Sequence, residues 1–168
     1  MDQIVSLLIK AGAVLLALIA VLVGGYAVFA KNNGSTAASQ QSQLATNITS
    51  YINGGMTTRN YTGLDNSVAI KAGLVPKSMQ NGDGTTILGP WGNSQVTIAP
   101  WNQGHSEAWT NVDGDACATF ARSQNADRVA INGSEVAMSD PQAAVNIANN
   151  CNATSGVSQV SVTFEYSN

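Results

Sequence analysis

The sequence predicts an α+β protein in which an apolar N-terminal helix precedes a small head with an antiparallel sheet. Residues 11–30 form a run of twenty residues without a charge, which favours a long helix in an apolar environment. The rest of the chain alternates short helix-like and strand-like segments between turn residues, which is typical of an α+β domain. A length of 168 residues fits one domain with one appendage.

The composition excludes several function classes. Only 10 % of the residues are charged, against about a quarter in ordinary soluble domains, while Asn, Ser, Thr and Gln make up one third of the chain. The net charge is −3 and no basic cluster occurs, so direct binding of nucleic acid is not expected. Two Cys and one His are too few for a four-ligand zinc site. We expect no metal and no cofactor.

The run at residues 11–30 would span roughly 30 Å as a helix, the thickness of the hydrocarbon core of a bilayer. A cleavable secretory signal fits less well, because only Asp2 precedes the first apolar stretch and no basic residue does. We therefore predict a retained membrane helix, with a buried hairpin helix in a soluble protein as the alternative. Lys10 and Lys31 flank the run, so the positive-inside rule gives no orientation.

Cys117 and Cys151 lie 34 positions apart in the polar part of the chain. An even pair in a small domain favours a disulfide, which would stabilise the head by about 3–4 kcal/mol. Two separate buried thiols remain the alternative. A disulfide would place the head outside the cytoplasm.

Gly34 is expected to interrupt the helical pattern, which then resumes. Apolar side chains recur with helical spacing at Leu44, Ile48, Tyr51 and Ile52. Gly54 and Gly55 are expected to end this helix. The predicted organisation is an apolar helix over 1–31, its amphipathic continuation over 32–54 and a globular head over 55–168.

The head is predicted to contain short elements in a fixed order. Helices are expected over 64–73, from Asp113 or Asp115 through Ser123, and from Asp140 to Cys151. Strands are expected over 87–88, 95–99, 107–112, 128–131, 135–138 and 160–166. Pro90 to Gly92 forms a tight corner, and Asn132-Gly133 is a strong hairpin signal.

The sequence gives no support for catalysis. His105, the only histidine, is assigned to a polar, solvated loop, and no G-x-S-x-G pattern occurs. The segments 81–84 and 113–115 resemble fragments of calcium loops but lack the ligand spacing, so turn formation and helix capping explain them. We predict that the protein is not an enzyme.

Trp91, Trp101 and Trp109 lie within nineteen residues of one another. Three such rings form a local core or a subunit contact, or else a surface that stacks on sugar rings. The first interpretation is favoured, and the second remains open.

The order of several short segments resembles the type IV pilins, and most closely the PilS-like type IVb pilins of conjugative thin pili. The segments that carry the resemblance are 72–79, 89–92, 96–98, 116–117 and 151–152. It implies a long helix packed on a disulfide-closed head. It also implies a single-pass precursor in the inner membrane, processed by a prepilin peptidase and extracted by an assembly machinery into a helical filament of identical subunits. A tip adhesin and the recipient cell surface are further partners that it implies.

The resemblance also implies roles for residues of the apolar helix. Val14, Leu18, Val21 and Leu22 are expected in the filament core. Family members carry Glu at the fifth mature position, where this chain has Val5. We hypothesise that Asp2, Lys10 and the N-terminal amine make the polar contacts between subunits, although both side chains could instead lie at the membrane surface.

Two further expectations concern processing and helix unwinding. No basic leader is present, so Met1 is expected to be the processed first residue. Gly24 and Gly25, or Gly34, are candidates for local unwinding of the helix in the filament. Each glycine lowers the free-energy cost of unwinding by about 1 kcal/mol relative to alanine.

These observations predict the major subunit of an extracellular type IVb pilus that serves conjugation or adhesion. Two alternatives stay open. One is a membrane-tethered periplasmic module that binds carbohydrate through the Trp cluster, and the other is a pseudopilin of a secretion system.

Overall fold

The computed structural model of the chain describes residues 32–54, 59–152 and 159–167. Contacts divide the chain into a unit Met1–Asn32 and a unit Asn33–Asn168. The predicted apolar span at 11–30 lies outside the described residues. Within the three described ranges, no helix combines the length and apolarity that crossing a bilayer requires.

The described part begins with a helix over residues 32–53, here called the long helix. The other helices are α2 (Asn66–Lys71), the 3-10 turn η1 (Lys77–Met79), α3 (Gly114–Ala121) and α4 (Ala143–Asn152). The strands are β1 (Ile87–Leu88), β2 (Gln95–Trp101), β3 (Gly104–Asp113), β4 (Arg128–Ile131), β5 (Ser134–Ala137) and β6 (Gln159–Tyr166). Each predicted helix and strand of the head therefore exists, with boundaries shifted by a few residues.

The strands form one antiparallel sheet of six in the order β1-β2-β3-β6-β4-β5. Strand β6, which follows the other five strands in the sequence, thus lies between β3 and β4. The tight turn between β4 and β5 is made by Asn132 and Gly133, whose φ angles are 48° and 83°. Both values lie in the left-handed region that a two-residue hairpin turn needs, and this confirms the hairpin prediction.

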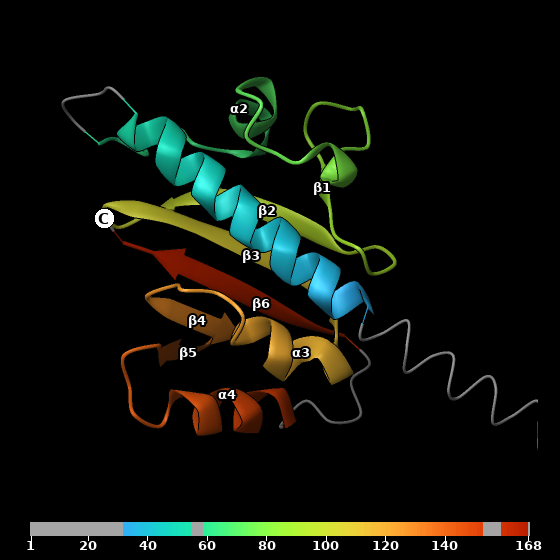
Figure 1. The fold of residues 1–168 in the computed structure, drawn as a ribbon, viewed down its shortest axis with the longest axis vertical. Helices are drawn as coiled ribbons and strands as arrows, with labels where there is room; N and C mark the ends of the chain where they lie inside the picture. Colours follow the sequence, from blue (N-terminus) through green and yellow to red (C-terminus); the bar gives the residue numbers. More distant parts are fainter. Residues whose placement is uncertain (1–31, 55–58, 153–158, 168) are drawn as a thin grey trace, which may run out of the picture. The chain divides into compact units, whose positions relative to one another are not determined.

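The long helix, α3 and α4 lie on the same face of the sheet (Figure 1). Strand register explains why this face is apolar. Trp109 of β3 pairs with Val162 of β6, and Val162 in turn pairs with Ile131 of β4. All three are buried, and residues paired across strands point to the same face. The core therefore lies between the helices and this face, as an α+β fold with a one-sided sheet requires.

Two expectations for the long helix are wrong. Gly34 does not interrupt the helix, which runs through it. A Cβ at Gly34 would lie 3.4 Å from the Cβ of Ala116 in α3, so the glycine allows the two helices to approach closely. Tyr51 is 48 % exposed, whereas Leu44, Ile48 and Ile52 are buried. The buried stripe repeats every four residues, and Tyr51 falls beside it.

Helix α4 begins at Ala143, three residues after Asp140, where the sequence predicts its start. Asp140 still caps this region, since its Oδ1 accepts a hydrogen bond from the backbone N–H of Gln142 at 2.8 Å. Its carbonyl also accepts from the N–H of Ala143 at 2.9 Å. These bonds close a separate turn, and the helix starts where the turn ends.

Candidate functional site

The two cysteines form the disulfide that joins α3 to α4. The sulfurs of Cys117 and Cys151 are 2.04 Å apart, and their Cα atoms are 5.9 Å apart. Both side chains are buried. The disulfide prediction is confirmed, and the alternative of two separate thiols is wrong.

The three tryptophans do not form a surface cluster. Trp109 is fully buried and Trp91 is 7 % exposed, because both lie on the helix-covered side of the sheet. Of the three, only Trp101, at the end of β2, is half-buried. Edge-to-face contacts at centroid distances of 5.1–6.2 Å join four rings, which we call the aromatic cluster: Trp91, Trp109, Phe120 and Phe164. Trp91 and Trp109 thus belong to a local core, which is the favoured interpretation, and a sugar-stacking surface would have only Trp101 of the three rings.

His105 is not on a solvated loop, because β3 begins at Gly104, three residues earlier than predicted. It is 1 % exposed. Its ring lies between those of Tyr61 and Tyr166, with centroid distances of 5.4 and 5.0 Å and nearly parallel planes. Its Nε2 is 3.3 Å from Oε1 of Glu107, which has no exposed surface.

Gln41 of the long helix links this pair to the rest of the core. Its Nε2 donates to Oε2 of Glu107 and, at 3.0 Å, to the hydroxyl of Tyr166. Its Oε1 accepts from Nε1 of Trp109. We call the joined side chains the polar cluster: Gln41, His105, Glu107, Trp109 and Tyr166. Because each buried polar group needs a partner, the cluster holds one residue of the long helix against two strands.

Burial controls the ionisation of this cluster. It raises the pKa of Glu107, and the neighbouring His105 and Gln41 oppose part of that rise. The pKa of Tyr166 is also raised, mainly by burial and to a lesser extent by the charge of Glu107. Its phenol therefore stays protonated at neutral pH. His105 and Glu107 are closed to solvent, so no substrate can reach the pair. Its role is structural.

Sequence reasoning missed this cluster, although a signal was present. The buried stripe of the long helix runs back from Ile48 through Leu44 to Gln41 and Ala37. A helical period extended towards the N-terminus therefore puts an amide on the core face, and a buried amide calls for polar partners on the sheet.

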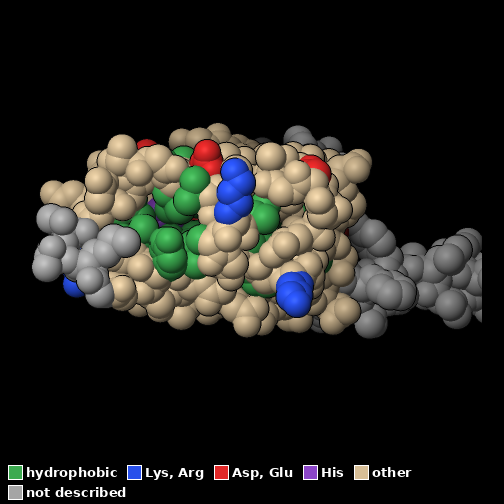
Figure 2. All heavy atoms as spheres, turned by 90° about the horizontal axis from the view of Figure 1, so that it is seen from above, with side chains coloured by type: hydrophobic (Ala, Val, Ile, Leu, Met, Phe, Trp, Pro, Cys, Tyr) green, Lys and Arg blue, Asp and Glu red, His purple; other side chains and the backbone are tan. Residues whose placement is uncertain are grey.

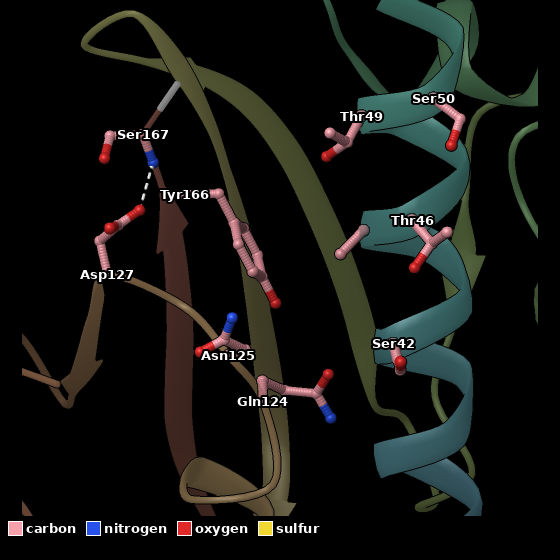
Figure 3. A pocket seen from close by; sticks show the side chains of 10 residues that line it. Ser42, Thr46, Thr49, Ser50, Gln124, Asn125, Asp127, Tyr166 and Ser167 are labelled. Carbon is pink, nitrogen blue, oxygen red and sulfur yellow. Dashed lines mark hydrogen bonds between the residues drawn. The ribbon is translucent and has the colours of Figure 1, made fainter. Parts of the chain in front are cut away.

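A groove lies between the long helix and the connection from α3 to β4 (Figure 3). We call it the hydroxyl groove, and its volume is about 470 Å³. It is lined by Ser42, Ala45, Thr46, Thr49, Ser50, Gln124, Asn125, Asp127, Tyr166 and Ser167. Asp127 fixes its far wall, since Oδ2 accepts from the N–H of Ser167 at 2.6 Å. The described residues contain no group of three or more His, Cys, Asp and Glu side chains that could hold a metal ion.

The predicted contact residues of the apolar helix lie outside the described residues. They are Asp2, Val5, Lys10, Val14, Leu18, Val21, Leu22, Gly24 and Gly25. Gly34 is described and helical, and its unwinding in a filament stays a prediction.

Comparisons with known proteins place the chain in a family. Residues 31–165 match the family model described as PilS N terminal. The crystal structure of a type IV b pilin from Salmonella typhi matches with a TM-score of 0.59 and 23 % identity, over 80 % of this chain and 99 % of that one. No curated protein sequence matches.

The two matches support different statements. At 23 % identity the structural match shows the fold alone, and it confirms the predicted pilin-like α+β head. The family match covers most of the chain and confirms the resemblance drawn from the sequence. The chain therefore belongs to the PilS family of type IVb pilins, which are structural subunits of pili and not enzymes.

Proposed function

We propose that this chain is the major subunit of a type IVb pilus that serves conjugative mating-pair formation or adhesion. One observation carries the proposal. The same chain contains a segment that matches the PilS family, residues 31–165, and a charge-free apolar run at residues 11–30. A head alone would not polymerise through a buried core, and an apolar helix alone would offer no specific surface.

The physical argument concerns where the apolar run can go. An apolar helix needs either lipid or an apolar protein partner. The inner membrane provides the first before assembly, and the same helix of neighbouring subunits provides the second. Burial at about 25 cal/mol per Å² then offsets departure from the bilayer. Contacts between unlike faces of identical subunits produce an open fibre when the rotation from one subunit to the next does not close a ring. In this proposal Val14, Leu18, Val21 and Leu22 line the fibre core.

The head suits the outside of such a fibre. Figure 2 shows one face on which uncharged polar side chains and backbone surround a group of hydrophobic atoms, with only isolated acidic and basic side chains. Repeated copies of such a surface can lie close together with little repulsion between charges. The disulfide between α3 and α4 resists local opening of the head.

The test is to shear cells that express the system, pellet the high-molecular-weight fraction and image it by electron microscopy. Mass spectrometry then identifies its main chain and its N-terminal residue. Fibres made mainly of this chain are expected. A chain that stays wholly in the inner membrane would overturn the proposal and favour a tethered module, and a short periplasmic stub would favour a secretion pseudopilin.

A second test addresses the contacts of Asp2 with Lys10 and the N-terminal amine of another subunit. The Asp2→Ala variant is expected to reduce the yield of sheared pili at least tenfold, because it would leave a buried cation without a partner. Gln3→Ala is the matched control and is expected to keep the normal yield. Normal pili from the Asp2 variant would contradict this assignment.

A further inference from the structure

We propose that the hydroxyl groove is a binding site for a neutral saccharide. The proposal goes beyond assembly into a pilus and does not depend on it. It rests on the chemistry of the lining residues, on the placement of one aromatic ring and on the size of the groove.

The lining selects a polar, uncharged ligand. Sites for drug-like molecules are mostly apolar, whereas this one is lined mainly by hydroxyl and amide side chains. No Lys or Arg lines it, which disfavours phosphate and other anions. Its one charged side chain, Asp127, already accepts a hydrogen bond from Ser167.

The hydroxyls come from one face of the long helix. Helical spacing puts one or two lining positions on each successive turn, and Figure 3 shows them opposite the connection from α3 to β4. Among the described residues, five lining side chains take part in no hydrogen bond: Ser42, Thr46, Thr49, Ser50 and Asn125. Hydroxyls and amides both donate and accept, which matches the rim of a sugar, where each hydroxyl does the same.

Tyr166 provides the aromatic surface that a sugar ring needs. Its side chain reaches from β6 towards the long helix (Figure 3). Stacking on His105 and the hydrogen bond from Gln41 hold the ring in place, so binding would cost little further ordering. The π face of an aromatic ring is electronegative and attracts the polarised C–H groups of a pyranose. The volume of about 470 Å³ falls within the roughly 300–1,000 Å³ of known small-molecule sites.

The test uses the full chain in phosphocholine micelles, since a maltoside detergent would itself present a sugar. The probes are the methyl glycosides of glucose, galactose, mannose and N-acetylglucosamine. Sorbitol is the control ligand, because it has similar hydroxyls but no rigid C–H face. NMR follows the ring signals of Tyr166 and the side-chain amide of Asn125. We expect a saturable shift of both signals with at least one glycoside and none with sorbitol.

Three variants make the test specific. Thr46→Val is expected to weaken binding about fivefold through the loss of one hydrogen bond. Thr36→Val, at another exposed threonine of the same helix that does not line the groove, is expected to leave binding unchanged. Tyr166→Phe keeps the ring and is expected to retain binding. No saturable shift with any glycoside, an equal shift with sorbitol, or equal weakening by both threonine variants would each overturn the proposal.

Discussion

The aromatic cluster and the polar cluster are neighbouring parts of one core, but they are built on different chemistry. The aromatic cluster joins four rings edge to face, whereas the polar cluster stacks His105 between two tyrosines and hydrogen-bonds an amide to a carboxyl group. Trp109 belongs to both, since its ring contacts Phe120 and its Nε1 donates to Gln41.

The difference between them concerns energy and specificity. Apolar rings contribute mainly through the area that they bury, in any orientation that fills the space. A buried amide that serves three partners tolerates one placement only, because a shift of the long helix by one residue would leave all three groups unsatisfied. The aromatic cluster therefore provides stability, and the polar cluster fixes the register of the long helix on the sheet.

The largest effect is expected in the aromatic cluster. Phe120→Ala removes a ring that contacts three other aromatic rings, and we expect a loss of about 4 kcal/mol in the free energy of unfolding. Denaturant unfolding followed by tryptophan fluorescence measures it. Thr119→Ala, in the same helix, is the control and should cost less than about 0.5 kcal/mol. A similar cost for both variants would show that helix α3, and not the ring, decides the loss.

A smaller loss is expected when the amide of the polar cluster is removed. Gln41→Ala leaves the carboxyl of Glu107, the indole N–H of Trp109 and the hydroxyl of Tyr166 without this partner. We expect a cost of about 2 kcal/mol. Gln43→Ala replaces an exposed glutamine of the same helix and should be nearly neutral in the same unfolding measurement. Equal effects of the two variants would mean that the cluster contributes nothing to stability.

The pH dependence of stability separates the two clusters, since only the polar cluster titrates. Burial raises the pKa of Glu107 in the folded head, so the folded state holds a proton at pH values where the unfolded chain has lost it. Its contribution is complete below the unfolded pKa of about 4.3 and is lost as the pH rises through the folded pKa. Relative to Glu107→Gln, the wild type should therefore lose stability as the pH rises.

Unfolding free energies at several pH values, from about 4.5 to about 8, measure this difference. Asp115→Asn, at an exposed side chain of α3, is the control for the loss of one surface carboxylate. A constant difference between wild type and Glu107→Gln would contradict a raised pKa of Glu107 in the folded head.

The smallest effect is expected at the exposed ion pair of the β4–β5 hairpin. Nη1 of Arg128 lies 2.6 Å from Oε2 of Glu135, but the two side chains are 48 % and 55 % exposed. A double-mutant cycle to alanine should give a coupling of about 0.5 kcal/mol, because water screens the pair. The coupling should fall further in about 1 M salt. A coupling as large as the cost of Gln41→Ala would contradict the distinction between buried and exposed polar contacts.

Local signals predicted most elements of the head. The turn at Asn132-Gly133 and the cap at Asp113, which accepts from the N–H of Asp115 at 3.2 Å, depend on neighbouring residues only. The terminal strand followed from strict alternation. These features need no knowledge of the rest of the fold, so the sequence contains enough information to place them.

Strand order and the two candidate sites were beyond reach for a physical reason. Gln41 and Glu107 are 66 positions apart, and no pattern in the sequence around either residue indicates that the two are in contact. His105 looked solvated because its neighbours in the sequence are polar. Its burial depends on distant residues, since its ring stacks between Tyr61 and Tyr166. The hydroxyl groove likewise combines the long helix with residues more than seventy positions away.

The central position of β6 has a consequence for synthesis and export. Strands β1 to β3 pair among themselves, and β4 pairs with β5, but only β6 connects the two groups. Because β6 follows the other five strands in the sequence, the sheet cannot close until residues up to Tyr166 have been made and have reached the same compartment. A nascent chain thus carries two unjoined half-sheets with open edges, the form most exposed to misassembly, and a chain cut before Gln159 stays in that form permanently.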